Sequence, residues 1–164
     1  MRTGRLWRSG VFRYGVLAGV AGGLAEIIWV CLYAGATGGD ATVLARGITT
    51  AAGMNSSLAS APVVSGIFVH MGLAVLLGIA LAGLWQSLVN FRPSIASLYV
   101  VSLAVLAGVW VANFYLVLPV VSPHFVHLVP YGVSLTSKLL FALAAAETLR
   151  RCAAPRLIAG RQTA

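Results

Sequence analysis

Long runs of apolar residues dominate this chain, and short polar or charged connections separate them. No charged residue occurs between Arg46 and Arg92, or between Arg92 and Lys138. A helix of about 20 apolar residues crosses the roughly 30 Å hydrocarbon core of a bilayer. The pattern therefore predicts an all-α fold, an integral membrane four-helix bundle that forms one domain over residues 1–164. The spans are expected over residues 14–34, 62–89, 94–121 and 130–152.

The composition agrees with a membrane protein and argues against a soluble one. Of the 164 residues, 60% are hydrophobic and 9% are charged, which is too little polar surface to cover a soluble domain of this size. The 18 glycines are an enrichment typical of membrane helices. A formal charge of +8 would favour nucleic acid as the partner of a soluble protein, but here the arginines flank the spans. The lipid bilayer is the expected partner, and nucleic acid is not.

The basic residues are distributed asymmetrically across the predicted spans. Cytoplasmic connections are enriched in lysine and arginine, so the richer side is expected to face the cytoplasm of a bacterial cell, with both termini there. An N-terminal signal peptide is the alternative, but the first apolar run is too long for one and contains Glu26. Nine of the eleven basic residues lie on the richer side: Arg2, Arg5, Arg8, Arg13, Arg92, Arg150, Arg151, Arg156 and Arg161.

The first outer connection, residues 35–61, contains apolar residues at helical spacing. They follow Asp40, which is suited to be a helix N-cap. We predict a short amphipathic helix on the outer membrane surface, with Arg46 directed towards the lipid head groups. An ordered loop without a helix is the alternative. The apolar residues are Val43, Leu44, Gly47, Ile48 and Ala51.

The second connection, Asn90 to Pro93, is too short for a cytoplasmic domain, so the second and third spans are expected to form an antiparallel hairpin. Small residues recur every four positions, or multiples of four, in the first and second spans. Such rows let helix backbones approach closely in a membrane, so these two spans are expected to pack together. The rows are Gly15, Gly19 and Gly23 in the first span, and Gly66, Ala74, Gly78 and Ala82 in the second.

Each span contains a polar residue at a similar depth. Glu26, His70, Asn113 and Lys138 each lie about seven to ten residues from the outer end of their span, or about 10 to 15 Å below the interface. An isolated charge in lipid costs several kcal/mol, so an acid and a base at equal depth are expected to face inward and pair. We predict that Glu26 and Lys138 are partners, with His70 and Asn113 as hydrogen-bonding neighbours.

Two interpretations of this polar cluster remain open. As a structural element, a buried ion pair fixes the rotation and register of the helices, and this interpretation is preferred. As a functional element, Glu26, His70 and Lys138 form a proton relay or the polar end of a quinone or solute pocket. Glu147 is not assigned to a functional site. Arg150 and Arg151 follow it by three and four residues, the spacings at which charged side chains pair on a helix.

Other candidate chemistry is weaker. His124 and His127 have a spacing that suits a metal ion, but two ligands are an incomplete site. His70 has no second histidine in another span to complete haem ligation. The sequence contains no P-loop, GxSxG, HExxH or CxxC motif, and its three acidic residues leave no paired carboxylates. No cofactor is expected.

The C-terminal half carries a resemblance. The run from Asn113-Phe114-Tyr115 to Pro119, followed by residues 122–131, resembles that of small four-helix inner-membrane proteins of bacteria. This resemblance implies a fold and a location but no activity.

Two functional hypotheses follow, with a third at lower weight. The first is a non-catalytic accessory or structural subunit of a larger respiratory or transport complex, in contact with other membrane subunits or with copies of itself. The second is a small proton-coupled permease or carrier that uses Glu26, His70 and Lys138, although no inverted repeat is visible between the halves. The third is an enzyme that acts on a lipid or quinone.

Overall fold

The computed structural model describes residues 3–53, 61–88 and 94–159, with side chains from residue 10 to residue 152 within these ranges. Among these residues the fold is all-α. Four helical segments are long and apolar enough to cross a membrane: Gly10–Thr37, Pro62–Leu88, Ile95–Val121 and Tyr131–Cys152. Each agrees with one predicted span to within a few residues. The helices are α1 Thr3–Thr37, α2 Thr42–Ala51, α3 Pro62–Leu88, α4 Ile95–Ala112, α5 Leu118–Val121 and α6 Tyr131–Ala159.

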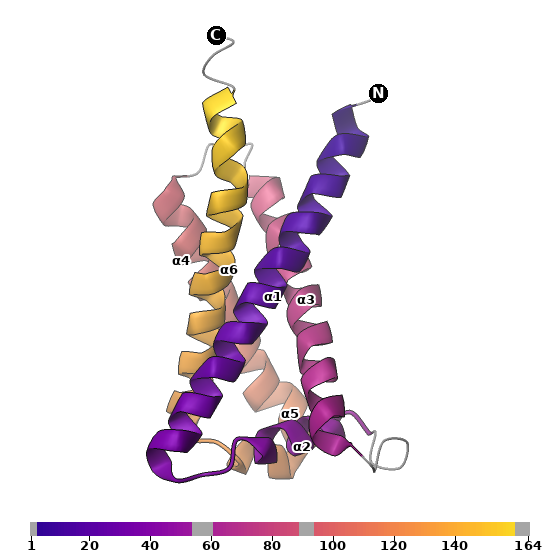
Figure 1. Ribbon diagram of the computed structural model, residues 1–164, viewed down its shortest axis with the longest axis vertical. Coiled ribbons are helices and arrows are strands. Elements are labelled where there is room, and N and C mark those ends of the chain that lie inside the picture. The colour runs from indigo at the N-terminus through magenta and orange to yellow at the C-terminus, as the bar shows by residue number, and fades with distance from the viewer. Residues whose placement is uncertain (1–2, 54–60, 89–93, 160–164) are drawn as a thin grey trace.

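The four long helices run up and down, so that both termini lie at one end of the molecule and α2 at the other (Figure 1). We call these the terminal end and the α2 end. Helix α1 has the most extensive contacts, with α3 and with α6, and α4 packs on α6. Helices α3 and α4 are antiparallel and contribute side chains to the same buried apolar cluster, but their described backbones come close at few points. The two helices have the antiparallel directions that the expected hairpin requires, but each packs mainly on a different partner, α3 on α1 and α4 on α6.

Helices α1 and α3 pack backbone against backbone, as their small residues predict. A Cβ atom added at Gly19 would lie 2.5 Å from the carbonyl oxygen of Ala74, and one added at Gly78 would lie 2.5 Å from that of Gly15. Real Cβ atoms do not approach other atoms so closely. Glycine is therefore required where the two helices meet.

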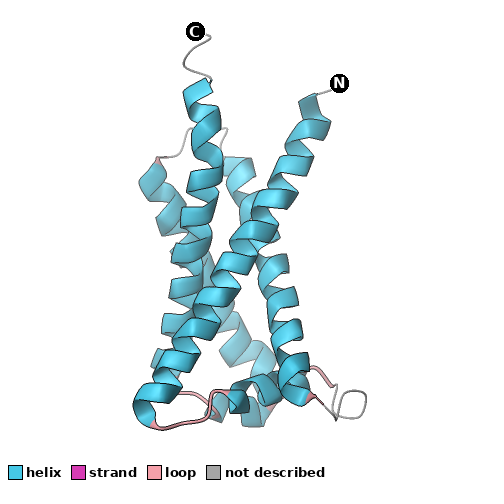
Figure 2. Cartoon of the chain, in the orientation of Figure 1, coloured by secondary structure: helices cyan, strands magenta, loops and turns pink. Residues whose placement is uncertain are grey.

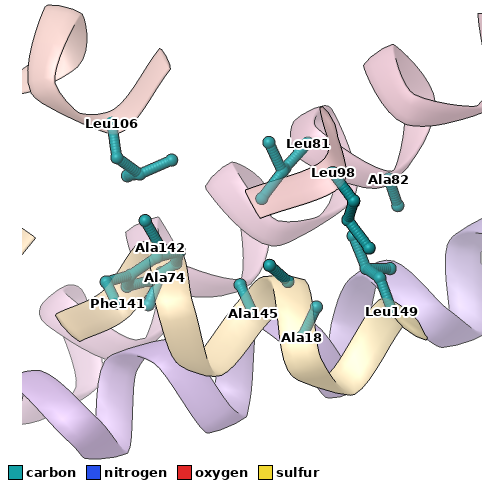
Figure 3. Close-up of a cluster of buried hydrophobic side chains, with 11 residues drawn as sticks. Ala18, Ala74, Leu81, Ala82, Leu98, Leu106, Phe141, Ala142, Ala145 and Leu149 are labelled. Carbon is teal, nitrogen blue, oxygen red and sulfur yellow. The ribbon is translucent and has the colours of Figure 1, made fainter. Parts of the chain in front are cut away.

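A cluster of buried apolar side chains packs between the helices from the middle of the bundle towards the terminal end, and Figure 3 shows its members. All four long helices contribute, α6 mainly through alanines that let its neighbours come close. The largest fully buried side chains here are Phe141 and Leu106. The cluster comprises Ala18, Ala74, Leu81, Ala82, Leu98, Leu106, Phe141, Ala142, Ala145, Ala146 and Leu149.

The predicted amphipathic helix is present as α2, which lies across the opposite end (Figures 1 and 2). It packs against α3, where a side chain at Gly66 would collide with the backbone of Ala45. The predicted N-cap is wrong by one residue, because α2 begins at Thr42 and its N-cap is Ala41. Asp40 instead accepts hydrogen bonds from the backbone and hydroxyl of Thr42 at 2.8 and 2.7 Å, and these bonds lower the pKa of its carboxyl group.

The third span contains an irregular turn, which was not predicted from the sequence. Residues Asn113–Val117 form a π-helical turn, in which the backbone N–H of Leu118 donates to the carbonyl of Asn113. Pro119 follows, and it both lacks an N–H and crowds the carbonyl four residues before it. A proline and a π turn are established causes of a change in helix direction. Asn113 therefore begins an irregular turn within a continuous helical span.

The close contact between α1 and α3 gives a first prediction. Gly78→Ala should lower the midpoint of unfolding in an SDS titration of the purified protein, because its Cβ needs space that α1 backbone occupies. Overpacking of this kind typically costs about 1–3 kcal/mol.

Gly83→Ala on the same helix is the matched control. A Cβ at Gly83 meets nothing within 4 Å, and alanine favours a helix over glycine by about 1 kcal/mol. Gly83→Ala should leave the midpoint unchanged or raise it. Equal midpoints for the two variants would contradict the packing described here.

Candidate functional site

A buried ion pair joins α1 to α6 in the half of the bundle nearer the α2 end. The Nζ atom of Lys138 lies 2.8 Å from Oε1 of Glu26, which is 4% exposed. The predicted contact between these two residues is confirmed. In α1, Gly22 precedes Glu26 by one helical turn and allows the ring of Phe141 to pack against the helix backbone. This contact brings α1 and α6 close enough for the pair to form.

Two further α6 residues support the pair. The hydroxyl of Ser137 donates to Oε1 of Glu26 at 3.3 Å. The Lys138 ammonium group lies 5.6 Å from the centre of the Phe141 ring, a distance at which a cation is attracted to the ring face. Phe141 was not among the residues predicted for this site, although its position three residues after Lys138 places both on one face of a helix.

His70 of α3 lies on the other side of Glu26. Its Nε2 atom is 3.7 Å from Oε2 of Glu26 and 3.4 Å from the carbonyl oxygen of Gly23. The first distance is too long for a hydrogen bond. Among the described residues, Oε2 of Glu26 therefore has no hydrogen-bond partner although it is buried. Oε1 of the carboxylate therefore interacts with both Lys138 and Ser137, whereas Oε2 accepts no hydrogen bond.

A cavity of about 520 Å³ adjoins the ion pair. Glu26, His70 and Lys138 line one part of it, and apolar side chains line most of the rest. Leu73 and Leu76 of α3 line it and are also 60% and 64% exposed. Val109 of α4 lines the cavity as well, so the cavity lies between α3 and α4, and the exposure of the two leucines indicates that it opens there to the surface.

Asn113 lies on the wall of this cavity, at the start of the π turn. In the described part of the chain, no hydrogen bond joins it to Glu26, His70 or Lys138. The predicted neighbour thus lines the same cavity as the other three residues, but the expected hydrogen bonds to them are not formed among the described residues. Ser134 is on the same wall, where its hydroxyl accepts from the indole N–H of Trp110 at 3.0 Å.

A second, smaller cavity of about 170 Å³ lies between α1, α2 and α3. It is lined by Glu26 and His70 as well, and by Leu44 and Ile48 of α2. The same two α2 residues line the larger cavity. The apolar face of α2 is therefore turned towards the interior of the bundle, next to the polar cluster.

The two histidines of the candidate metal site lie apart from this cluster. His124 and His127 are exposed and belong to a 3₁₀ helix, Pro123–His127, at the α2 end. Their spacing of three places them on one face of such a helix. Among the described residues, no group of three potential metal-ligating side chains includes them.

Near the terminal end, Glu147 forms ion pairs with the two arginines that its sequence spacing predicts. Arg150 and Arg151 each approach its Oε1 atom to 2.6 Å. The hydroxyl of Tyr99 donates to its Oε2 atom and so connects α4 to α6. Sequence spacing identified the two arginines within one helix, but it carries no signal for a contact between helices.

The chain matches no protein-family model, no curated protein sequence and no solved structure. Four helices long and apolar enough to cross a bilayer suggest a multi-pass membrane protein.

The ion pair gives a second prediction, a double-mutant cycle. Glu26→Gln and Lys138→Met should each lower the stability in an SDS titration by about 3 to 5 kcal/mol, because each leaves a charge or polar group uncompensated in low dielectric. The double replacement should cost less than the sum of the two single losses, which indicates contact.

Glu147→Gln is the matched control within the same fold. Glu147 is 31% exposed, and water can rehydrate its arginine partners when the carboxylate is lost. Its replacement should cost less than Glu26→Gln. Additive losses for Glu26→Gln and Lys138→Met would show that the two side chains do not stabilise each other.

Proposed function

We propose that this chain is a multi-pass protein of the bacterial cytoplasmic membrane, and that it acts as a non-catalytic accessory protein that binds a small apolar molecule beside Glu26 and Lys138. The observation that carries this proposal is the cavity of about 520 Å³ next to the ion pair. Ligand sites typically measure about 300–1,000 Å³, with mostly apolar walls and a few polar groups. The cavity has this size and this lining.

The orientation in the membrane is argued from charge. Nine of the eleven basic residues fall before the first span, in the second connection or after the last span. The positive-inside rule assigns these segments to the cytoplasm. The terminal end of the bundle then faces the cytoplasm, and α2 and the cavity belong to the outer half of the membrane.

The packing of the terminal end supports binding rather than transport. The buried apolar cluster occupies the terminal half of the bundle with side chains from all four long helices. The cavity lies on the other side of this cluster, towards α2. A solute in the cavity would meet a close-packed core before it reached the cytoplasm, whereas the opening between α3 and α4 faces the bilayer.

A proton-coupled carrier is the second candidate function. His70 lies 3.7 Å from Glu26, and both residues line two cavities, so a proton relay through them is chemically reasonable. This function would require the helices to separate at the terminal end.

The exposed glycines support a role alongside a partner. A Cβ at Gly72 or Gly83 of α3 would meet nothing within 4 Å. The two residues are eleven positions apart and so lie on one face of the helix. Small residues are enriched where membrane helices meet, so this face suits another membrane subunit or a second copy of the chain.

The orientation gives a third prediction. Reporter fusions after Ala164 and between Asn90 and Pro93 should report the cytoplasm, whereas fusions near Asn55 and near His124 should report the outer side. The charge distribution is the reason for this expectation. A periplasmic signal from the C-terminal fusion would overturn the four-span topology.

Ligand binding gives a fourth prediction. Protein extracted from its native membrane in mild detergent should retain an apolar small molecule, detected by mass spectrometry of an organic extract. Val109→Trp places an indole in the cavity and should abolish this retention, because Val109 lines the wall. Val100→Trp, on the exposed face of the same helix, is the control and should retain it. Equal amounts in both variants would contradict the proposal.

A further inference from the structure

Lys138 is the only lysine in the chain, although the chain contains ten arginines. Arginine binds a carboxylate through a planar fork of N–H donors, so it is well suited to pairing alone. The chain uses arginine in this way near the terminal end, where the partners of Glu147 are Arg150 and Arg151. The cavity beside Lys138 leaves space for the longer arginine side chain. Pairing with Glu26 therefore does not by itself account for a lysine at this position.

Lysine has a chemical property that arginine lacks. Its amine can lose a proton within a protein and then attack a carbonyl carbon, whereas the guanidinium group of arginine stays protonated. The position of Lys138 suits this reaction. Its side chain is 21% exposed and lines the cavity of about 520 Å³, so a molecule in the cavity lies next to it. A proton acceptor is also present, because Oε1 of Glu26 lies 2.8 Å from Nζ.

From these observations we infer that Lys138 binds an apolar aldehyde covalently, as a protonated imine whose counter-ion is Glu26. This inference rests on the proposed ligand-binding function and names the class of its ligand.

The reaction needs only the two side chains and the aldehyde. Nζ of Lys138 gives one proton to Glu26, and the free amine attacks the aldehyde carbon. A second nitrogen proton moves to the former carbonyl oxygen, which becomes the hydroxyl group of a carbinolamine. Glu26 then returns its proton to this hydroxyl group, which leaves as water while the carbon–nitrogen double bond forms. Overall, an ammonium ion and an aldehyde give an iminium ion and water.

The ion pair keeps its charge balance in this reaction. The iminium nitrogen carries one positive charge, as the ammonium does, so Glu26 stays compensated in the apolar interior. A bound acid or amine would instead bring an unpaired charge into this environment, at a large desolvation cost. Ser137 donates to Oε1 of Glu26 at 3.3 Å and so fixes this oxygen beside the amine. The reaction does not use Oε2, which stays buried next to His70.

The remaining walls of the cavity suit the apolar body of the aldehyde. Leu73, Leu76, Phe114 and Phe125 are among the side chains that line it. Two of these, Leu73 and Leu76, are also exposed, so an aldehyde dissolved in the bilayer can enter beside them. Water hydrolyses imines, and a site with mostly apolar walls protects the bond by keeping water away.

A photoreactive aldehyde tests binding and imine formation separately in the intact protein, reconstituted in lipid nanodiscs. The probe is hexadecanal with a diazirine in its chain. Light attaches the bound probe to nearby peptides whether or not an imine forms, whereas sodium cyanoborohydride converts an imine into a stable amine. Peptide mass spectrometry should find photolabelled peptides of α3 and α4 and a reduced adduct on Lys138. The corresponding alcohol should photolabel the same peptides but add no mass to Lys138.

Two substitutions provide the controls. Arg46→Lys introduces an exposed amine on α2, outside the cavity. In this variant, Lys138 should form the reduced adduct about tenfold faster than the introduced lysine, because the cavity holds the aldehyde beside it. Adding Val109→Trp should abolish the adduct on Lys138 and leave the adduct on the introduced lysine unchanged. The introduced lysine thus shows that the reagents remain active in the blocked protein.

The contrary outcomes separate the two proposals. Photolabelled cavity peptides without a reduced adduct on Lys138 would overturn the imine and leave the ligand-binding function in place. An adduct on Lys138 that forms no faster than the one on the introduced lysine would also overturn the imine, and so would one that persists with Val109→Trp. Photolabelling of the cavity peptides by neither the aldehyde nor the alcohol would overturn the ligand-binding function itself.

Discussion

The backbone contact between α1 and α3 determines where the polar residues meet. Gly19 and Gly23 both pack against Ala74, because neither has a side chain to hold the helices apart. The helices are antiparallel, so moving from this contact towards the α2 end means moving forward along α1 and backward along α3. Glu26 lies about one turn forward from Gly23, and His70 about one turn back from Ala74. The two side chains therefore arrive at one depth.

The same reasoning applies between α1 and α6. The ring of Phe141 packs on Gly22, and one turn nearer the α2 end Glu26 faces Lys138. Helix α1 is thus the common partner of both contacts and carries the one buried carboxylate between them. Burial of this carboxylate is costly without a partner, so the ion pair and the glycine contacts stabilise a single helix register together. A shift of either neighbour by one residue would separate the charges.

Much of this arrangement was predictable from sequence, because it depends on periodicity and depth. The spans, the small-residue contact between the first two spans and the partnership of Glu26 with Lys138 follow from positions along individual helices. Other features depend on which helices become neighbours. The separation of α3 from α4, and with it the cavity, has no local signal, because a short connection fixes only how near two helix ends lie. The bond from Tyr99 to Glu147 was missed for the same reason.

The two ends of the bundle differ because their side chains differ in size. Alanines on α6 let its neighbours come close in the terminal half, where the buried apolar cluster lies. Towards the α2 end, bulky rings take their place: Trp110 stacks on Phe114 at 5.3 Å, and Tyr131 meets the edge of Trp110 at 6.1 Å. These rings associate α4 with the start of α6. Helix α4 consequently follows α6 rather than α3. The space left beside α3 is the cavity, so its position next to the ion pair results from the same packing that buries Glu26.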